Sequence, residues 1–303
     1  MSSKSIQLSF KTKESMPLRD AIRNYGISKK ALTSIKFEGG SILVNGEEKT
    51  VRHIVKEGDQ VTINFPEEKK SEGLIPEKMN FPILFEDEHI LIILKEAGIS
   101  TIPSKEHPTG TVANGIAGYL EACKLPATVH IVTRLDKDTS GVICVAKHRH
   151  AHHLFSEMQK NDLIIKTYEA LVHGHIAEDA FVIEAPIGRK STSIIERLVT
   201  SEGKYARTSG HVLGRLTIGQ EKFTHVSLTL HTGRTHQIRV HMAHIGHPLL
   251  GDDLYGGKLT IMNRQALHAR KIEFIHPFTK QPLAITAEYS KDMNIILSKS
   301  TEQ

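Results

Sequence analysis

The chain has 303 residues, little cysteine and no long run of apolar residues. Its two cysteines, Cys123 and Cys144, stand far apart, which argues against a disulfide framework and against a zinc ribbon. The first ten residues, MSSKSIQLSF, lack an apolar core, and no stretch approaches the ~20 apolar residues that a membrane helix needs. We therefore expect a cytoplasmic protein that does not enter a membrane.

Neither sign of charge dominates the chain, since 39 Lys and Arg oppose 34 Asp and Glu. Most of the net charge of +5 lies at one end, because residues 1–70 hold thirteen Lys and Arg against nine Asp and Glu. A basic segment of this kind is compatible with a polyanionic partner such as nucleic acid. The candidates for phosphate contacts are Lys29, Lys30, Lys36 and Arg52.

Residues 16–65 predict a small unit of two short helices followed by strands. Pro17 stands at a plausible helix start, and Ser28 is placed to cap a second helix. Asn45-Gly46 interrupts an apolar stretch and is a strong hairpin signal. The charged stretch 66–80, which contains Pro and Gly, predicts a linker.

From residue 81 onward, apolar strands alternate with a few helices. Helices are expected at 111–122 and 150–160, and strands at 81–97, 141–148, 166–176 and 225–242. This mixture indicates an α+β domain on an antiparallel or mixed sheet. We expect three segments, namely a small domain at 1–65, a linker at 66–80 and a larger domain at 81–303.

One short stretch, VTRLDKDTSG at residues 132–141, carries a candidate catalytic carboxylate, Asp136. A simple alternative is that its aspartates only bind backbone amides in a turn that ends at Gly141. For Asp136 to act as a nucleophile or base, a nearby arginine would have to favour its charged form. Arg234 and Arg239 are candidates, on a turn followed by a strand or by the start of a helix.

Five motifs follow one another in the order VTRLDKDTSG, KTYEALVHG, TGRTHQIRVH, GHPLLGDDLYGG and LHARKIEFIHP. In this order they resemble the RluA/RluD family of RNA pseudouridine synthases, over residues 81–290. Residues 16–65 similarly resemble an S4-type RNA-binding domain. The resemblance implies a pseudouridine synthase fold with a mixed, mainly antiparallel sheet, preceded by a small α/β RNA-binding domain.

The resemblance also implies an activity, the isomerisation of specific uridines in structured RNA to pseudouridine without a cofactor or metal. By similarity Asp136 is the catalytic nucleophile, attacking either the ribose or the base. Tyr168 stacks on the target base, and Arg239 pairs with the aspartate. Arg134 fills the space that the flipped base vacates or holds its phosphate, and Leu267 packs over the pocket.

The chain departs from the family pattern at two positions. Thr133 stands where many members have histidine, and Glu96 stands where proline is usual. The first change affects how RNA is held beside the flipped base, and the second reshapes a loop.

Two rival interpretations are a protein with a metal site and a protein without catalytic activity. Histidines cluster at 148–153 and 236–247, but no glutamate stands between them as in H-E-x-x-H, so we expect no metal site. The second rival is a catalytically silent RNA-binding factor for ribosome assembly. Such a factor would have no chemical need for Asp136, Tyr168 and Arg239 together, and all three are present.

The substrate is expected to be large-subunit ribosomal RNA of the 23S type, with transfer RNA as the alternative. A monomer is expected. Residues 175–222 contain the least recognisable part of the chain, and we leave open whether the stretch SEGKYARTSGHVLGR within them forms an RNA-contacting loop or a solvated insertion.

Overall fold

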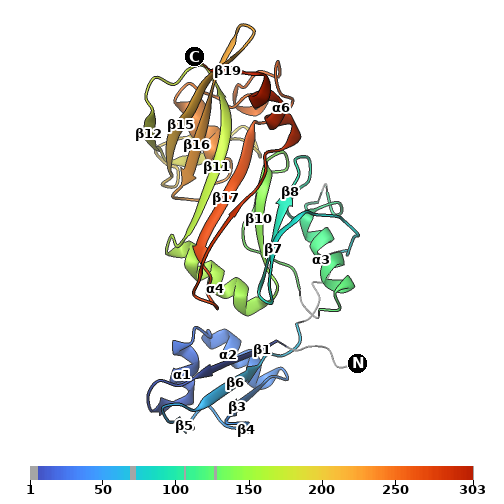
Figure 1. Cartoon of the computed structure of the whole chain (residues 1–303), viewed down its shortest axis with the longest axis vertical. Helices are drawn as coiled ribbons and strands as arrows, with labels where there is room; N and C mark the ends of the chain where they lie inside the picture. Colours follow the sequence, from blue (N-terminus) through green and yellow to red (C-terminus); the bar gives the residue numbers. More distant parts are fainter. Residues whose placement is uncertain (1–5, 69–72, 106, 126–127, 303) are drawn as a thin grey trace.

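The computed structural model of the protein describes residues 6–68, 73–105, 107–125 and 128–302. The first part of the chain forms a small unit, at the bottom of Figure 1, around a four-stranded antiparallel sheet. Its elements are β1 (Gln7–Lys11), β2 (Met16–Pro17), α1 (Leu18–Asn24), α2 (Lys29–Phe37), β3 (Ser41–Val44), β4 (Glu47–Glu48), β5 (Ile54–Val55) and β6 (Gln60–Asn64). The sheet has the order β1-β6-β3-β4, and β2 pairs with β5.

Local signals explain how this unit folds. Pro17 directly precedes α1, and the Ser28 hydroxyl caps α2 by accepting the backbone N–H of Ala31 at 3.1 Å. Asn45 and Gly46 both have positive φ, 51° and 86°, as the hairpin turn between β3 and β4 requires. These predicted elements are confirmed. The strand β1, at the edge of the sheet, was not predicted, although it lies within the small domain expected at 1–65.

The predicted linker at 66–80 has no helix or strand in its described residues, yet it makes specific contacts. The Glu68 carboxylate accepts the backbone N–H of Arg149 at 2.6 Å and lies 2.7 Å from Nε2 of His130. Glu77 accepts the Gly110 N–H at 2.7 Å. This stretch therefore packs against the second part of the chain.

The second part is built on a mixed, eleven-stranded sheet whose central path is β12-β15-β16-β11-β17-β10-β8-β7. Among the described strands, β10 and β17 form the one parallel pair. The strands are β7 (Ile83–Glu86), β8 (Ile90–Lys95), β9 (His130–Ile131), β10 (Ser140–Ala146), β11 (Ile164–His173), β12 (Ala180–Glu184), β15 (Arg207–Ile218), β16 (Glu221–Leu230), β17 (Leu267–Ile275), β18 (Pro282–Thr286) and β19 (Thr301–Glu302). A separate hairpin joins β13 (Ile187–Arg189) to β14 (Arg197–Val199).

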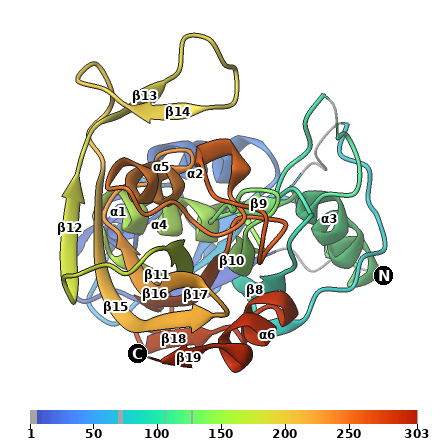
Figure 2. The same cartoon turned by 90° about the horizontal axis from the view of Figure 1, so that it is seen from above.

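Helices surround this sheet. They are α3 (Val112–Ala122), α4 (Arg149–Lys160), α5 (Gln237–His244), the 3-10 turn η1 (Asp253–Tyr255) and α6 (Lys291–Lys299). Figure 1 shows α4 between the large sheet and the N-terminal unit, and Figure 2 shows the β13–β14 hairpin extending beyond α5. Within the described ranges, no helix combines the length and apolar character that crossing a lipid bilayer would require.

The structure corrects two expectations from the sequence. The strand expected over residues 225–242 ends at Leu230, and of the strand or helix start left open after the following turn, the structure forms the helix α5 at Gln237–His244. Residues 175–222 are neither a loop nor a simple insertion, since they supply β12, the β13–β14 hairpin and β15. With twelve residues, β15 pairs with both β12 and β16 and is part of the main sheet.

Candidate active site

The loop that carries Asp136 lies between β9 and β10 and is clamped by Thr101. The Thr101 hydroxyl donates to the carbonyl of Leu135 at 2.7 Å and accepts the Leu135 N–H at 3.2 Å. The loop closes with the Thr139 N–H donating to the carbonyl of Asp136 at 3.1 Å. The backbone of Asp136 thus makes the expected turn, while 30% of its side chain is exposed. Its carboxylate is therefore accessible.

A fully buried lysine fixes the same loop from the end of β8. Nζ of Lys95 donates to three backbone carbonyls, those of Glu96 at 2.9 Å and of Ile99 and Lys137 at 2.8 Å. Burial disfavours its charge and lowers the pKa of Lys95 to about 8, against the opposing pull of Asp138. Since Lys137 directly follows Asp136, the lysine ties the candidate nucleophile to the sheet.

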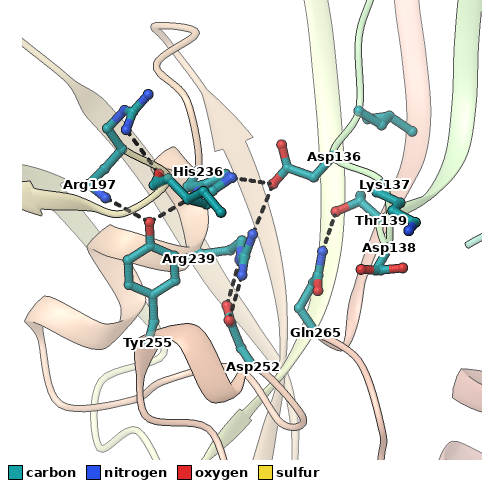
Figure 3. A network of polar contacts seen from close by, with 12 residues as sticks. Asp136, Lys137, Asp138, Thr139, Arg197, His236, Arg239, Asp252, Tyr255 and Gln265 are labelled. Carbon is teal, nitrogen blue, oxygen red and sulfur yellow. Dashed lines mark hydrogen bonds and ion pairs between the residues drawn. The ribbon is translucent and has the colours of Figure 1, made fainter. Parts of the chain in front are cut away.

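Arg239 reaches the site from α5 and makes its shortest contacts with a different carboxylate. Its Nε and Nη2 each donate to Asp252 at 2.7 Å, whereas Nη1 lies 3.4 Å from Oδ2 of Asp136 (Figure 3). Burial opposes the charge of Arg239, but the hydrogen bonds and charge of Asp252, followed by the charge of Asp136, leave its pKa raised. The guanidinium is therefore a fixed positive charge beside Asp136.

Tyr168 and Leu267 come from the adjacent strands β11 and β17. Both side chains are buried, and the pairing of these strands shifts register next to Tyr168. Burial, followed by the negative charge of Asp136, raises the pKa of the Tyr168 hydroxyl, which stays protonated at neutral pH. The two side chains line the same cavity as the Asp136 carboxylate.

A single cavity of about 500 Å³ brings the predicted residues together. It is lined by residues from the Asp136 loop, β11, the start of α5 and β17, including Arg134, Asp136, Tyr168, Arg239 and Leu267. Arg134 is exposed at this site. The four basic residues predicted to contact phosphate, Lys29, Lys30, Lys36 and Arg52, are exposed on the N-terminal unit, outside this cavity.

Three further residues at this site were not predicted to act beside Asp136, although His236 had been considered as a metal ligand. Asp252 is buried in the turn before η1, although its motif GHPLLGDDLYGG was recognised. His236 and Tyr255 form a hydrogen bond of 2.8 Å beside Asp136. The available signal was only that all three belong to recognised motifs, because their mutual contacts depend on the fold.

The histidine clusters do not converge on a common point. In the second cluster, His241 is buried between the Thr208 hydroxyl and the carbonyl of Ala185, while His247 contacts the carbonyl of His173. In the parts of the chain that the structure describes, no three His, Cys, Asp or Glu side chains gather as metal ligands would.

Comparison with known proteins identifies the family. The sequence model of the family described as RNA pseudouridylate synthase matches residues 89–244, just over half of the chain. The chain belongs to the RNA pseudouridylate synthase family. As a member of this family it is an isomerase that acts on RNA, which confirms the expected enzyme class.

Relatives of this pseudouridine synthase extend over most of its length. An uncharacterised RNA pseudouridine synthase of Bacillus subtilis, YjbO, is 48% identical over 282 residues, which are 93% of this chain and 98% of the relative. The ribosomal large subunit pseudouridine synthase D of Pseudomonas aeruginosa is 38% identical over 258 residues, covering 80% of this chain and 78% of that protein.

A solved structure supports the fold of the synthase. Human RNA pseudouridylate synthase domain containing 1 matches with a TM-score of 0.57 and 26% identity, over 69% of this chain and 84% of that chain. This match confirms the expected pseudouridine synthase fold, with its mixed sheet and helices.

Proposed function

We propose that the enzyme isomerises a uridine of large-subunit ribosomal RNA and that Asp136 is its nucleophile. The observation that carries this proposal is the position of the Asp136 carboxylate, which lines the 500 Å³ cavity and lies 3.4 Å from the guanidinium of Arg239. A neighbouring positive charge favours the ionised carboxylate that nucleophilic attack requires. Tyr168 and Leu267 supply flat and apolar surfaces against which a uracil ring can stack.

The reaction exchanges one bond to the ribose for another. The bond between N1 of uracil and C1′ breaks, the bond between C5 and C1′ forms, C5 loses its proton and N1 gains one. Asp136 serves either by attacking C1′ as the uracil leaves or by adding to the base. Both routes need an ionised carboxylate and a pocket that holds the detached or turned base.

Arg134 is proposed to act on the RNA beside the extruded base. A uridine inside a helix is out of reach, so it must be flipped out at a cost of a few kcal/mol. Arg134 is exposed beside Asp136 and lines the cavity, so its guanidinium can occupy the vacated space or bind a phosphate.

Residues 1–65 are proposed to be an S4-type RNA-binding domain and residues 81–303 the catalytic domain, joined through 66–80. The separate core of the N-terminal unit and the exposed Lys29, Lys30, Lys36 and Arg52 support this division. The name of the Pseudomonas aeruginosa relative supports large-subunit ribosomal RNA as the substrate, with transfer RNA as the alternative. A cytoplasmic monomer completes the proposal.

The test is to map pseudouridine in total RNA by carbodiimide-dependent stops of reverse transcription. Cells lacking the gene would express the wild-type chain, Asp136→Asn, or Asp162→Asn as an exposed carboxylate-to-amide control. We expect one or more stops in large-subunit ribosomal RNA with the wild type and the control, and none with Asp136→Asn. Stops that persist with Asp136→Asn would refute its role, and unchanged RNA with folded wild-type protein would favour the silent binding factor.

A further inference from the structure

His236 stands between the catalytic loop and η1 in an unusual backbone conformation. It precedes the first residue of α5 with φ 56° and ψ 22°, in the left-handed region that non-glycine residues seldom occupy. This conformation costs on the order of 1–3 kcal/mol and persists only where surrounding contacts hold it. In this position the ring faces Asp136 and Tyr255 instead of capping the helix (Figure 3).

The contacts of Tyr255 determine which ring nitrogen of His236 carries the proton. The Tyr255 hydroxyl accepts the backbone N–H of Arg197 at 3.0 Å and lies 2.8 Å from Nδ1 of His236. In the described part of the chain it has no other hydrogen-bond acceptor than this nitrogen. When the hydroxyl donates to Nδ1, the single proton of the neutral imidazole resides on Nε2, the nitrogen that faces Asp136.

The ring is held in its neutral form by its surroundings. Only 11% of the His236 side chain is exposed, and burial lowers the pKa of His236 although Asp136 pulls in the opposite direction. Nε2 lies 3.8 Å from Oδ2 of Asp136, the same oxygen that Arg239 approaches. Contacts of this kind between groups at a reaction site commonly tighten when substrate binds.

We propose that His236 is a positioning residue, whose Nε2–H, together with Nη1 of Arg239, holds one oxygen of the reactive carboxylate of Asp136, with Tyr255 fixing the tautomer. The inference rests on the proposed role of Asp136. With two donors directed at Oδ2, this oxygen of Asp136 is restrained and its other oxygen is left free to react. The proposal assigns no proton transfer with substrate to His236.

The kinetic test uses full-length protein and RNA labelled with [5-³H]uridine, isolated from cells that lack the enzyme, with tritium release as the readout. We expect His236→Phe to lower the single-turnover rate by about 10- to 100-fold, the effect of losing one charge-assisted hydrogen bond, with unchanged RNA affinity. His236→Gln keeps a donor near the position of Nε2 and should restore most of the rate. His244→Gln, exposed on the same helix, is the matched control.

A spectroscopic test does not depend on activity. In ¹⁵N-histidine NMR of the full chain, with His236 assigned from the spectrum of His236→Gln, we expect a protonated Nε2 and an unprotonated Nδ1. Tyr255→Phe should remove this fixed tautomer and slow tritium release. A protonated Nδ1 in the wild type, or a His236→Phe variant as fast as the wild type, would overturn the inference. If Asp136→Asn remains active, the proposed function itself fails.

Discussion

Arg239 binds Asp252 more closely than it binds Asp136, with two contacts of 2.7 Å against one of 3.4 Å. The two parallel hydrogen bonds to Asp252 fix the plane of the guanidinium. Both partners are also buried. Only one of its nitrogens, Nη1, approaches Asp136. The buried carboxylate of Asp252 thus aims a positive charge at the proposed nucleophile without touching the nucleophile itself.

The first prediction concerns this buried carboxylate. Asp252→Asn leaves the charge of Arg239 buried without its partner, so we expect the free energy of unfolding to fall by about 3–5 kcal/mol. The rate of pseudouridine formation should fall as well, because the guanidinium is no longer held in one orientation. Urea unfolding and single-turnover kinetics measure the two effects. Asp253→Asn, the exposed neighbour, is the control, and equal stability of the two variants would contradict the prediction.

The sequence predicted the regular elements of the chain where their patterns were simple, and α5 shows why the choice between strand and helix stayed open elsewhere. Apolar Ile238, Val240 and Met242 alternate with polar residues, which is the pattern of a half-buried strand. In the structure all residues from 237 to 242 are buried, and polar members such as Arg239 and His241 have buried partners. A helix buried on every side has no polar face, so its periodicity gives no helical signal.

At the candidate site, too, some residues could be predicted from the sequence and others could not. Residues in recognisable motifs, such as Asp136 and Tyr168, could be proposed from the sequence, and the structure places them around one cavity. The pairing of Arg239 with Asp252 could not be proposed, because it depends on the turn that brings η1 against α5. Lys95 ended an apolar strand and gave no sign that its charge would be fully buried.

The second prediction concerns Lys95 and the loop that carries Asp136. Lys95→Met removes the shared donor of three carbonyls, and unmade hydrogen bonds of buried groups cost about 1–3 kcal/mol each. Removing a desolvated charge offsets part of this loss, so we expect a net destabilisation of about 2 kcal/mol or more. Urea unfolding measures it, and hydrogen exchange should quicken in residues 135–139. Exposed Lys105→Met should change neither quantity, and a Lys95→Met variant as stable as the wild type would refute the argument.

Buried histidines lie where α4 meets the N-terminal unit. His148 contacts Nδ1 of His89 through its Nε2 at 3.1 Å, and the ring of His150 stacks on Phe65 with centroids 5.5 Å apart. Burial, followed by the charges of neighbouring histidines, lowers the pKa of His148 to about 3 and that of His150 to about 4. Glu68 opposes the shift of His148.

The third prediction is a loss of stability in acid that depends on these rings. Well above about pH 6.5 both rings are neutral in the folded and in the unfolded chain, so they add no pH dependence to the free energy of unfolding. Below it the unfolded chain binds protons that the folded chain excludes, and each ring lowers the free energy of unfolding by up to about 1.4 kcal/mol per pH unit. Urea unfolding between about pH 7.5 and about pH 4.5 measures this slope. His150→Phe, which keeps a ring against Phe65, should reduce it, and an unchanged slope would show that His150 is protonated in the fold.

The fourth prediction concerns RNA binding by the N-terminal unit. If the four exposed residues Lys29, Lys30, Lys36 and Arg52 contact phosphates, replacing all four with glutamine should weaken RNA binding and flatten its dependence on salt. Each lost contact removes about 0.7–0.9 from the slope of log K against log salt concentration, so the total change should approach 3. A filter-binding titration over several salt concentrations measures it. The control replaces four exposed lysines elsewhere, Lys124, Lys258, Lys291 and Lys299. Equal slopes for the two quadruple variants would mean that the RNA follows a different surface.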